Sequence, residues 1–154
     1  MKLVIFTLAG KEYGVDIAYV REVIRMRKIT PVPDAAGYVE GVMSLRGEVA
    51  PLINLGKKLG LESKNVTALS RIIVTGLKKK PVGLIVDGVS DVLDIEEGTV
   101  TPPDEVLKEA TYLTGVAKLG ARIILLVDIR KLLSGEATKS IENVQKRVEV
   151  KKKG

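Results

Sequence analysis

Histidine and cysteine are both absent from this 154-residue chain. Without cysteine it has no disulfides and no thiolate ligands. Without histidine it has no imidazole general base, no Ser-His-Asp triad and no zinc site with nitrogen or sulfur ligands. Aromatic residues make up only 3%, with one Phe and no Trp. Because the residue types on which many active sites depend are missing, we expect a protein that is not an enzyme and that uses no metal or cofactor.

Long hydrophobic runs are missing as well. The N-terminal stretch MKLVIFTLAG is followed at once by Lys11 and Glu12, so it does not have the pattern of a signal peptide. No run of about 18 apolar residues occurs, which predicts no transmembrane helix and no direct insertion into a membrane. Together with the lack of cysteine, these features favour a cytoplasmic protein.

Carboxylates and glycines are present, but not in patterns that indicate a catalytic or ligand site. Asp16, Asp87, Asp91 and Asp94 could form an acid–base pair or a calcium site, yet no EF-hand spacing occurs. The 15 glycines form neither GxGxxG nor GxxxxGK[ST], so a phosphate-binding loop is not predicted. An enzyme with an unrecognised carboxylate site is therefore the weakest of the hypotheses.

The net charge of +6 comes partly from two lysine runs, 78–80 and 151–153. A solvated turn and a solvated tail explain these runs most simply, whereas nucleic acid or an acidic membrane surface is the alternative. Nucleic acid is disfavoured because aromatic residues do not alternate with basic ones to form a stacking platform. A small nucleic-acid-binding barrel is still the main competing hypothesis. Affinity for generic DNA or RNA that falls steeply with salt would favour it.

What the chain has in quantity is Val, Ile and Leu, arranged in an internal repeat. Residues 2–24 align with 71–93 at an offset of 69, and residues 38–59 align with 112–133 at an offset of 74. β-Branched residues favour strands, so each copy is predicted to be mostly β. The predicted domain covers residues 1–136, its two copies cover 2–60 and 71–134, and a basic, flexible tail covers 137–154.

Each copy is predicted to contain five short strands and a closing helix. Apolar runs bounded by turn residues are typical of strands in hairpins. Asn54 and Asp128 suit the N-caps of the closing helices, and Gly60 and Gly135 suit their C-terminal ends. Five strands per copy predict one small barrel per copy, with the two barrels sharing a core. The predicted strands are 3–8, 13–17, 20–26, 39–45 and 48–53, and 72–77, 82–86, 89–95, 113–119 and 121–127.

Comparison of the two copies also separates residues that the fold of the repeat unit requires from residues that it does not require. Gly41 recurs as Gly115, so we interpret it as structural, at a bulge or a close backbone approach. Arg46 does not recur, since Gly120 takes its place, which favours a role in binding a partner or in a local ion pair. Glu22 recurs as Asp91, either as a solvated acid, as an ion-pair partner of Arg46 or as a contact with a partner.

Four segments resemble the CheW family in order and spacing: YGVDIAYVREVIR, ITPVP, YVEGVMSLRGEVAPLINLGKKLG and VGLIVDGVSDVL. The resemblance covers roughly residues 1–135, and Ser44 stands where the family often has Asn. It implies an all-β fold of two intertwined five-stranded SH3-like barrels and a stand-alone chemotaxis adaptor with no catalysis.

The resemblance also implies two partners. One is the cytoplasmic tip of methyl-accepting chemoreceptors, and the other is the C-terminal regulatory domain of the histidine kinase CheA. The protein would then lie in receptor arrays at the membrane, with the kinase-facing residues placed only somewhere on the barrel surface. By resemblance, the receptor-facing positions are Val4, Val20, Glu22, Val23, Gly41, Arg46 and Val89.

Overall fold

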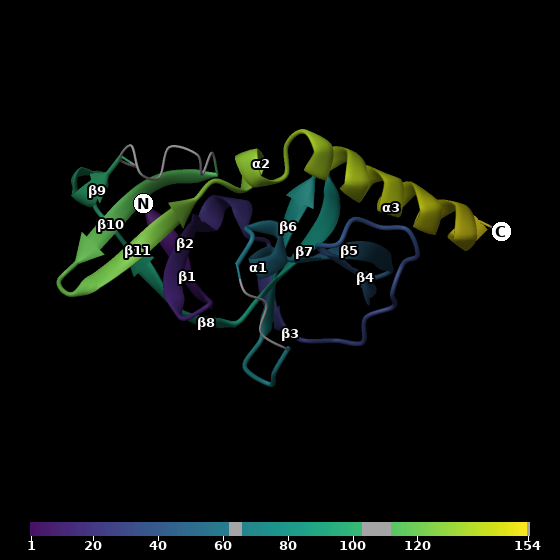
Figure 1. Cartoon of the computed structure of the whole chain (residues 1–154), viewed down its shortest axis with the longest axis horizontal. Helices are drawn as coiled ribbons and strands as arrows, with labels where there is room; N and C mark the ends of the chain where they lie inside the picture. Colours follow the sequence, from purple (N-terminus) through teal and green to yellow (C-terminus); the bar gives the residue numbers. More distant parts are fainter. Residues whose placement is uncertain (62–65, 103–111, 154) are drawn as a thin grey trace.

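The computed structural model describes residues 1–61, 66–102 and 112–153, and it describes their side chains except at 136 and 147–153. Within these residues eleven strands and five helical segments form (Figure 1). The strands are β1 (Lys2–Leu8), β2 (Lys11–Asp16), β3 (Glu22–Arg25), β4 (Val39–Leu45), β5 (Glu48–Asn54), β6 (Arg71–Leu77), β7 (Lys80–Val86), β8 (Gly88–Asp94), β9 (Val100–Thr101), β10 (Leu113–Leu119) and β11 (Arg122–Val127). The helical segments are η1 (Ile17–Tyr19), α1 (Leu55–Lys58), η2 (Glu97–Thr99), α2 (Ile129–Leu132) and α3 (Glu136–Lys153).

The ten predicted strands are all present, with ends that differ by a few residues, and β9 is an addition. β9 pairs with β10 at Thr101 and Val116. In the first copy an isolated bridge between Thr30 and Val42 takes the same place. The extra strand therefore continues the repeat rather than breaking it.

The two sheets exchange strands between the copies. Barrel A has the strand order β8-β1-β2-β11-β10-β9, and barrel B has the order β3-β6-β7-β5-β4. Each barrel thus combines the first hairpin of one copy with the later strands of the other, joined by the parallel pairs β2–β11 and β5–β7. The intertwining that the resemblance implied is confirmed. The prediction that each copy closes its own barrel is wrong.

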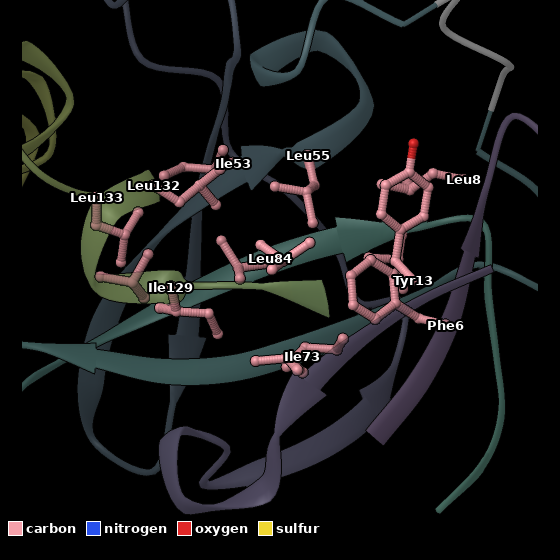
Figure 2. Packing of buried hydrophobic residues seen from close by; sticks show 14 of the residues in the cluster. Phe6, Leu8, Tyr13, Ile53, Leu55, Ile73, Leu84, Ile129, Leu132 and Leu133 are labelled. Atoms are coloured by element: carbon pink, nitrogen blue, oxygen red, sulfur yellow. The ribbon is translucent and has the colours of Figure 1, made fainter. Parts of the chain in front are cut away.

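Three apolar cores hold this arrangement together. One lies inside barrel B around Met43, Leu52 and Ile72, and one lies inside barrel A around Ile5 and Ile124. The largest lies between the barrels and is called the interface core here (Figure 2). Its buried members are Val4, Phe6, Leu8, Tyr13, Val15, Ile53, Leu55, Ile73, Val82, Leu84, Val86, Leu113, Val127, Ile129, Leu132, Leu133 and Ile141.

Strands with apolar side chains on both faces supply these cores. In β1, Leu3 and Ile5 point into barrel A, whereas Val4 and Phe6 point into the interface core. This explains why the strand reads as a continuous apolar run rather than as an alternation of apolar and polar residues. Fully burying each such side chain contributes about 1.5–3 kcal/mol.

The two short closing helices begin as predicted. The Asn54 side chain accepts a hydrogen bond from the Lys57 amide, and the Asp128 side chain accepts hydrogen bonds from the amides of Arg130 and Lys131. These contacts satisfy N–H groups that have no partner within the helix. Gly60, in a left-handed conformation with φ +73°, follows the C-cap of α1.

Residues 136–153 differ from the prediction of a flexible tail, because they form helix α3. Ile141 is fully buried in the interface core, and Ala137 and Val144 are 3% and 2% exposed. These apolar residues are spaced by four and three positions, so they share one helix face. An ion pair of 2.5 Å between Lys78 Nζ and Glu142 Oε1 ties α3 to the β6–β7 turn and lowers the pKa of the Glu142 carboxyl.

Of the two lysine runs, 78–80 lies at the turn between β6 and β7. The side chains of 151–153, and residue 154, lie outside the described residues. Among the described helices, none has the length and apolar character needed to cross a membrane.

Candidate partner-binding surface

Three of the predicted receptor-facing valines lie along the edge of the interface core. Val20 and Val89 are half-buried and pack against this core, one just before β3 and the other at the start of β8. Val23, on β3, is 38% exposed. Figure 1 shows β3 and β8 on the same, lower side of the molecule. The structure therefore places these valines where the two barrels meet, as an apolar edge that a partner can reach.

Val4 does not belong to this exposed edge. It is 2% exposed and lies inside the interface core. The sequence could not separate core from surface here, because β1 is apolar on both faces. A direct contact between Val4 and a partner is incompatible with this burial, so we correct its position from the surface to the core.

Glu22 and Arg46 form a two-point ion pair at the end of barrel B. Arg46 Nη1 lies 3.0 Å from Glu22 Oε2, and Arg46 Nη2 donates to Glu22 Oε1 at 3.2 Å. The Arg46 side chain is 76% exposed and that of Glu22 is 21% exposed. Glu22 pairs in register with Val74, whose side chain lies inside barrel B, so the two side chains lie on the same face of the sheet. The ion pair between these residues is one of the alternatives that the sequence left open.

Arg46 occupies a position that would suit glycine. It lies with Gly47 in the two-residue turn between β4 and β5, and its φ is +49°. Gly120 at the equivalent position has a φ of +60°. Non-glycine residues rarely adopt this left-handed conformation. The turn itself therefore gives no reason for an arginine at position 46.

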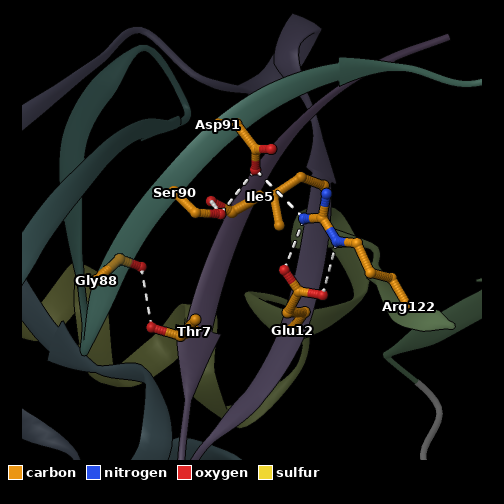
Figure 3. Close-up of polar contacts among 7 residues, drawn as sticks. All are labelled: Ile5, Thr7, Glu12, Gly88, Ser90, Asp91 and Arg122. Atoms are coloured by element: carbon orange, nitrogen blue, oxygen red, sulfur yellow. Dashed lines mark hydrogen bonds and ion pairs between the residues drawn. The ribbon is translucent and has the colours of Figure 1, made fainter. Parts of the chain in front are cut away.

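The strands of barrel A carry a related but denser group of polar contacts (Figure 3). Arg122 forms two hydrogen bonds to Glu12, of 2.7 and 3.1 Å, and lies 3.5 Å from Asp91 Oδ1. The hydrogen bond to Glu12 is the main cause that raises the pKa of Arg122 above its usual value. In both barrels an acid on the third strand of a copy thus pairs with an arginine from the following hairpin. The arginine comes from a different position in each copy, so the alignment did not reveal this likeness.

Gly41 is a scaffold residue, as predicted. It lies at a register shift in the β4–β5 pair, and Gly115 lies at the equivalent shift in the β10–β11 pair. Gly41 has a φ of +149°, and a Cβ atom there would lie 2.3 Å from the Thr30 carbonyl oxygen. Its part in any binding surface is therefore to let the chain at Thr30 approach β4.

One further residue of the apolar edge was missed by the sequence reasoning. Val92 on β8 is 55% exposed and occupies the position equivalent to Val23. The offset of 69 could have found it, because a surface position in one copy predicts a surface position in the other. Within the described residues, no group of three or more His, Cys, Asp or Glu is arranged to hold a metal ion.

Comparison with known proteins shows the family to which this chain belongs. The CheW-like domain family matches residues 2–137. The chain belongs to this family. It is 37% identical over 147 residues to the chemotaxis protein CheW of Klebsiella aerogenes, which covers 94% of this chain and 89% of that protein. It is 32% identical over 141 residues to CheW of Bacillus subtilis, which covers 90% of each.

A solved structure of the CheW family has the same fold. The scaffolding protein TtCheW from Thermoanaerobacter tengcongensis matches with a TM-score of 0.80 and 34% sequence identity, over 88% of this chain and 89% of that one. The sequence resemblance and the fold class are therefore confirmed. Membership of the CheW family makes this chain a chemotaxis scaffold protein, and the surface described above is its candidate docking site.

Proposed function

We propose that this chain couples methyl-accepting chemoreceptors to the histidine kinase CheA as a non-catalytic adaptor in the cytoplasm. It would bind the receptor tip with one surface and the CheA regulatory domain with another, within arrays at the membrane. The observation that carries the receptor half of this proposal is the apolar edge at the junction of the barrels. Exposed apolar edges with polar surroundings are typical of protein–protein docking sites.

The chemistry of this edge suits a helix. The receptor tip is expected to be helical, and an amphipathic helix docks through one apolar face. Val20, Val23 and Val89 would supply the apolar contact area. The ion pair of Arg46 and Glu22 lies at the end of barrel B and would fix the orientation of the helix through charged contacts. In this proposal Val4 and Gly41 act indirectly, through the core and the backbone that support the edge.

The kinase would use the barrel surface. By resemblance, its regulatory domain has the same two-barrel fold, so barrel can pack against barrel. The adaptor contributes binding surface rather than a reacting group, and a change at the receptor would shift the populations of the assembly.

Reconstitution of kinase activity tests this function. With receptor and CheA alone, autophosphorylation should stay basal, and addition of this protein should raise it strongly. Val23→Asp should abolish receptor pull-down, because it places a charge in the apolar edge. Ile123→Asp changes a residue that is 57% exposed on β11 and should leave pull-down intact. Equal kinase activity with and without the protein, at saturating receptor, would refute the proposal.

A further inference from the structure

Two arginines face each other across neighbouring strands of barrel B. Arg25 on β3 and Arg71 on β6 are directly paired in the antiparallel register. Directly opposed residues have their side chains on the same face, and like charges in such a pair destabilise the sheet. In the described part of the chain neither guanidinium forms an ion pair, and Arg71 Nη1 donates to the carbonyl oxygens of Ala68 and Ser70, both at 2.8 Å. The fold thus gains two hydrogen bonds from Arg71, whereas no described contact of this kind explains a second cation at Arg25.

The second copy places opposite charges at the same position. Lys2 and Asp94 are directly paired between β1 and β8, and at the offset of 69 they match Arg71 and Arg25. A cation facing an anion is the favourable arrangement for the sheet. The scaffold therefore accepts an acid at the position of Arg25, and would be more stable with one. Arg25 is consequently better explained by binding than by folding.

An exposed valine lies on the same face as the two arginines. Val23 pairs with Ile73, a member of the interface core, and is two residues from Arg25 along β3. Two residues of a strand span about 6.5–7 Å. On a helix, residues three or four positions apart lie about 5–6 Å from each other. The distance between the apolar and the cationic contact on β3 thus exceeds one turn of a docked helix only slightly, and Asp, Glu or Arg side chains can bridge the difference.

We propose that Arg25 and Arg71 together bind one carboxylate of the receptor helix, next to the apolar residue that docks on Val23. This inference rests on the proposed function and specifies the chemistry of its partner. The helix carries Asp or Glu three or four positions from its apolar contact residue. Guanidinium groups bind carboxylates through paired hydrogen bonds, and one carboxylate between them relieves the repulsion of the two cations. A nucleic acid fits this face less well, because its centre is a valine and not a stacking aromatic side chain.

Arg25→Asp tests the proposal, because stability and binding should change in opposite directions. The variant restores an opposite-charge pair with Arg71, so its melting temperature should rise. Its affinity for the cytoplasmic hairpin fragment of a chemoreceptor should fall at least about tenfold, which corresponds to 1.4 kcal/mol. Lys139→Glu, on the exposed face of α3, makes the same change in net charge and should leave affinity unchanged. Replacing the contacting receptor acid by Lys should restore binding to Arg25→Asp.

A second variant and a second ligand complete the test. Asp94→Arg creates a like-charge pair with Lys2 and removes the 3.4 Å ion pair of Asp94 with the N-terminal amine, so it should lower the melting temperature. If Arg25→Asp binds the receptor as well as Lys139→Glu does, the inference is wrong, while the proposed function survives. If the unaltered protein does not bind the receptor, both fail. If generic duplex DNA binds and Arg25→Asp abolishes that binding, the partner is a nucleic acid and the inference is overturned.

Discussion

Arg46 adopts a backbone conformation that glycine would adopt at lower cost. The left-handed region costs an L-residue about 1–2 kcal/mol, and an ion pair as exposed as the one with Glu22 returns at most about 1 kcal/mol. The side chain therefore does little for the stability of barrel B. Its two-point contact with Glu22 does hold the guanidinium in a defined place, which is the property that a binding residue needs.

The substitution Arg46→Gly should separate binding from folding at this turn. It copies Gly120, removes the backbone strain and loses an exposed ion pair, so the free energy of unfolding should change by no more than about 1 kcal/mol. Receptor affinity should fall by about 2 kcal/mol, or roughly thirtyfold, as is typical of an interface arginine. Lys118→Ala, at an exposed cation of β10, is the control. Melting curves and pull-downs on the same preparations give both values, and an unfolded Arg46→Gly variant would contradict the prediction.

Gly41 should behave in the opposite way, because its role is structural. Gly41→Ala combines a positive φ with a clash against the Thr30 backbone and should cost roughly 3 kcal/mol of stability. Gly115→Ala should cost less, because the nearest atom to its new Cβ, at 2.6 Å, belongs to the Val100 side chain, which can move. Chemical denaturation measures both. Equal costs, or a larger cost at Gly115, would show that the backbone contact is not what position 41 requires.

For these two residues the repeat acts as an internal comparison. A glycine shared by the copies indicated the scaffold, and an arginine present in only one copy indicated a separate role. For Val4 the resemblance alone implied a receptor-facing position, whereas its residue type fitted the core. An apolar residue on a strand buried on both faces has the same pattern as one at a surface edge. Whether such a residue is buried or exposed depends on how the two barrels pack and not on its residue type.

At the scale of elements, α3 is the segment that sequence reasoning described least well. Lysine-rich composition suggested a solvated tail, yet Ala137, Ile141 and Val144 form one apolar face. Five apolar residues among 18 positions that are rich in Lys, Arg and Glu are easily read as a polar tail. The helix is stabilised by a surface that only the packed barrels provide, consistent with the general dependence of short helices on tertiary contacts.

Ile141→Ala tests whether α3 is an integral part of the domain. Truncating a fully buried isoleucine should cost about 2–5 kcal/mol, because it leaves a cavity in the interface core. Lys139→Ala, two residues away on the exposed face, should change stability by less than about 0.5 kcal/mol. Unfolding midpoints in urea compare the two variants. If both variants have the same unfolding midpoint as the unaltered protein, α3 does not contribute to the interface core.

For the whole molecule, ten of the eleven described strands and their order along the chain could be predicted from local patterns, but the exchange between copies could not. Apolar runs locate strands, and turn residues join them into hairpins within a copy. The parallel pairs β2–β11 and β5–β7 join residues far apart in sequence, and nothing in a local pattern distinguishes them from pairing within a copy. The candidate binding surface could not be predicted for the same reason, because it exists only where the two barrels meet.

Exchange of strands predicts that neither copy folds alone. Fragment 1–61 lacks β6 and β7 of barrel B, and fragment 66–154 lacks β1 and β2 of barrel A. Each fragment by itself should therefore give a disordered circular dichroism spectrum without a melting transition. Mixed in equal amounts, the two should recover the strand-rich spectrum and elute as one complex. A cooperative melting transition for either fragment alone would contradict this expectation.

The exchanged hairpins also bear on how such a chain could arise. A single copy lacks half of every barrel, so an ancestral polypeptide of one copy would have been stable only as a homodimer whose subunits traded hairpins. Its two edges would have been identical by symmetry. Within one chain that constraint is absent, and the two strands differ, with Arg25 beside Val23 on β3 and Asp94 beside Val92 on β8. The apolar edge thus carries two cations at its β3 end and a balanced Lys2–Asp94 pair at its β8 end, so a docked partner can distinguish the two strands.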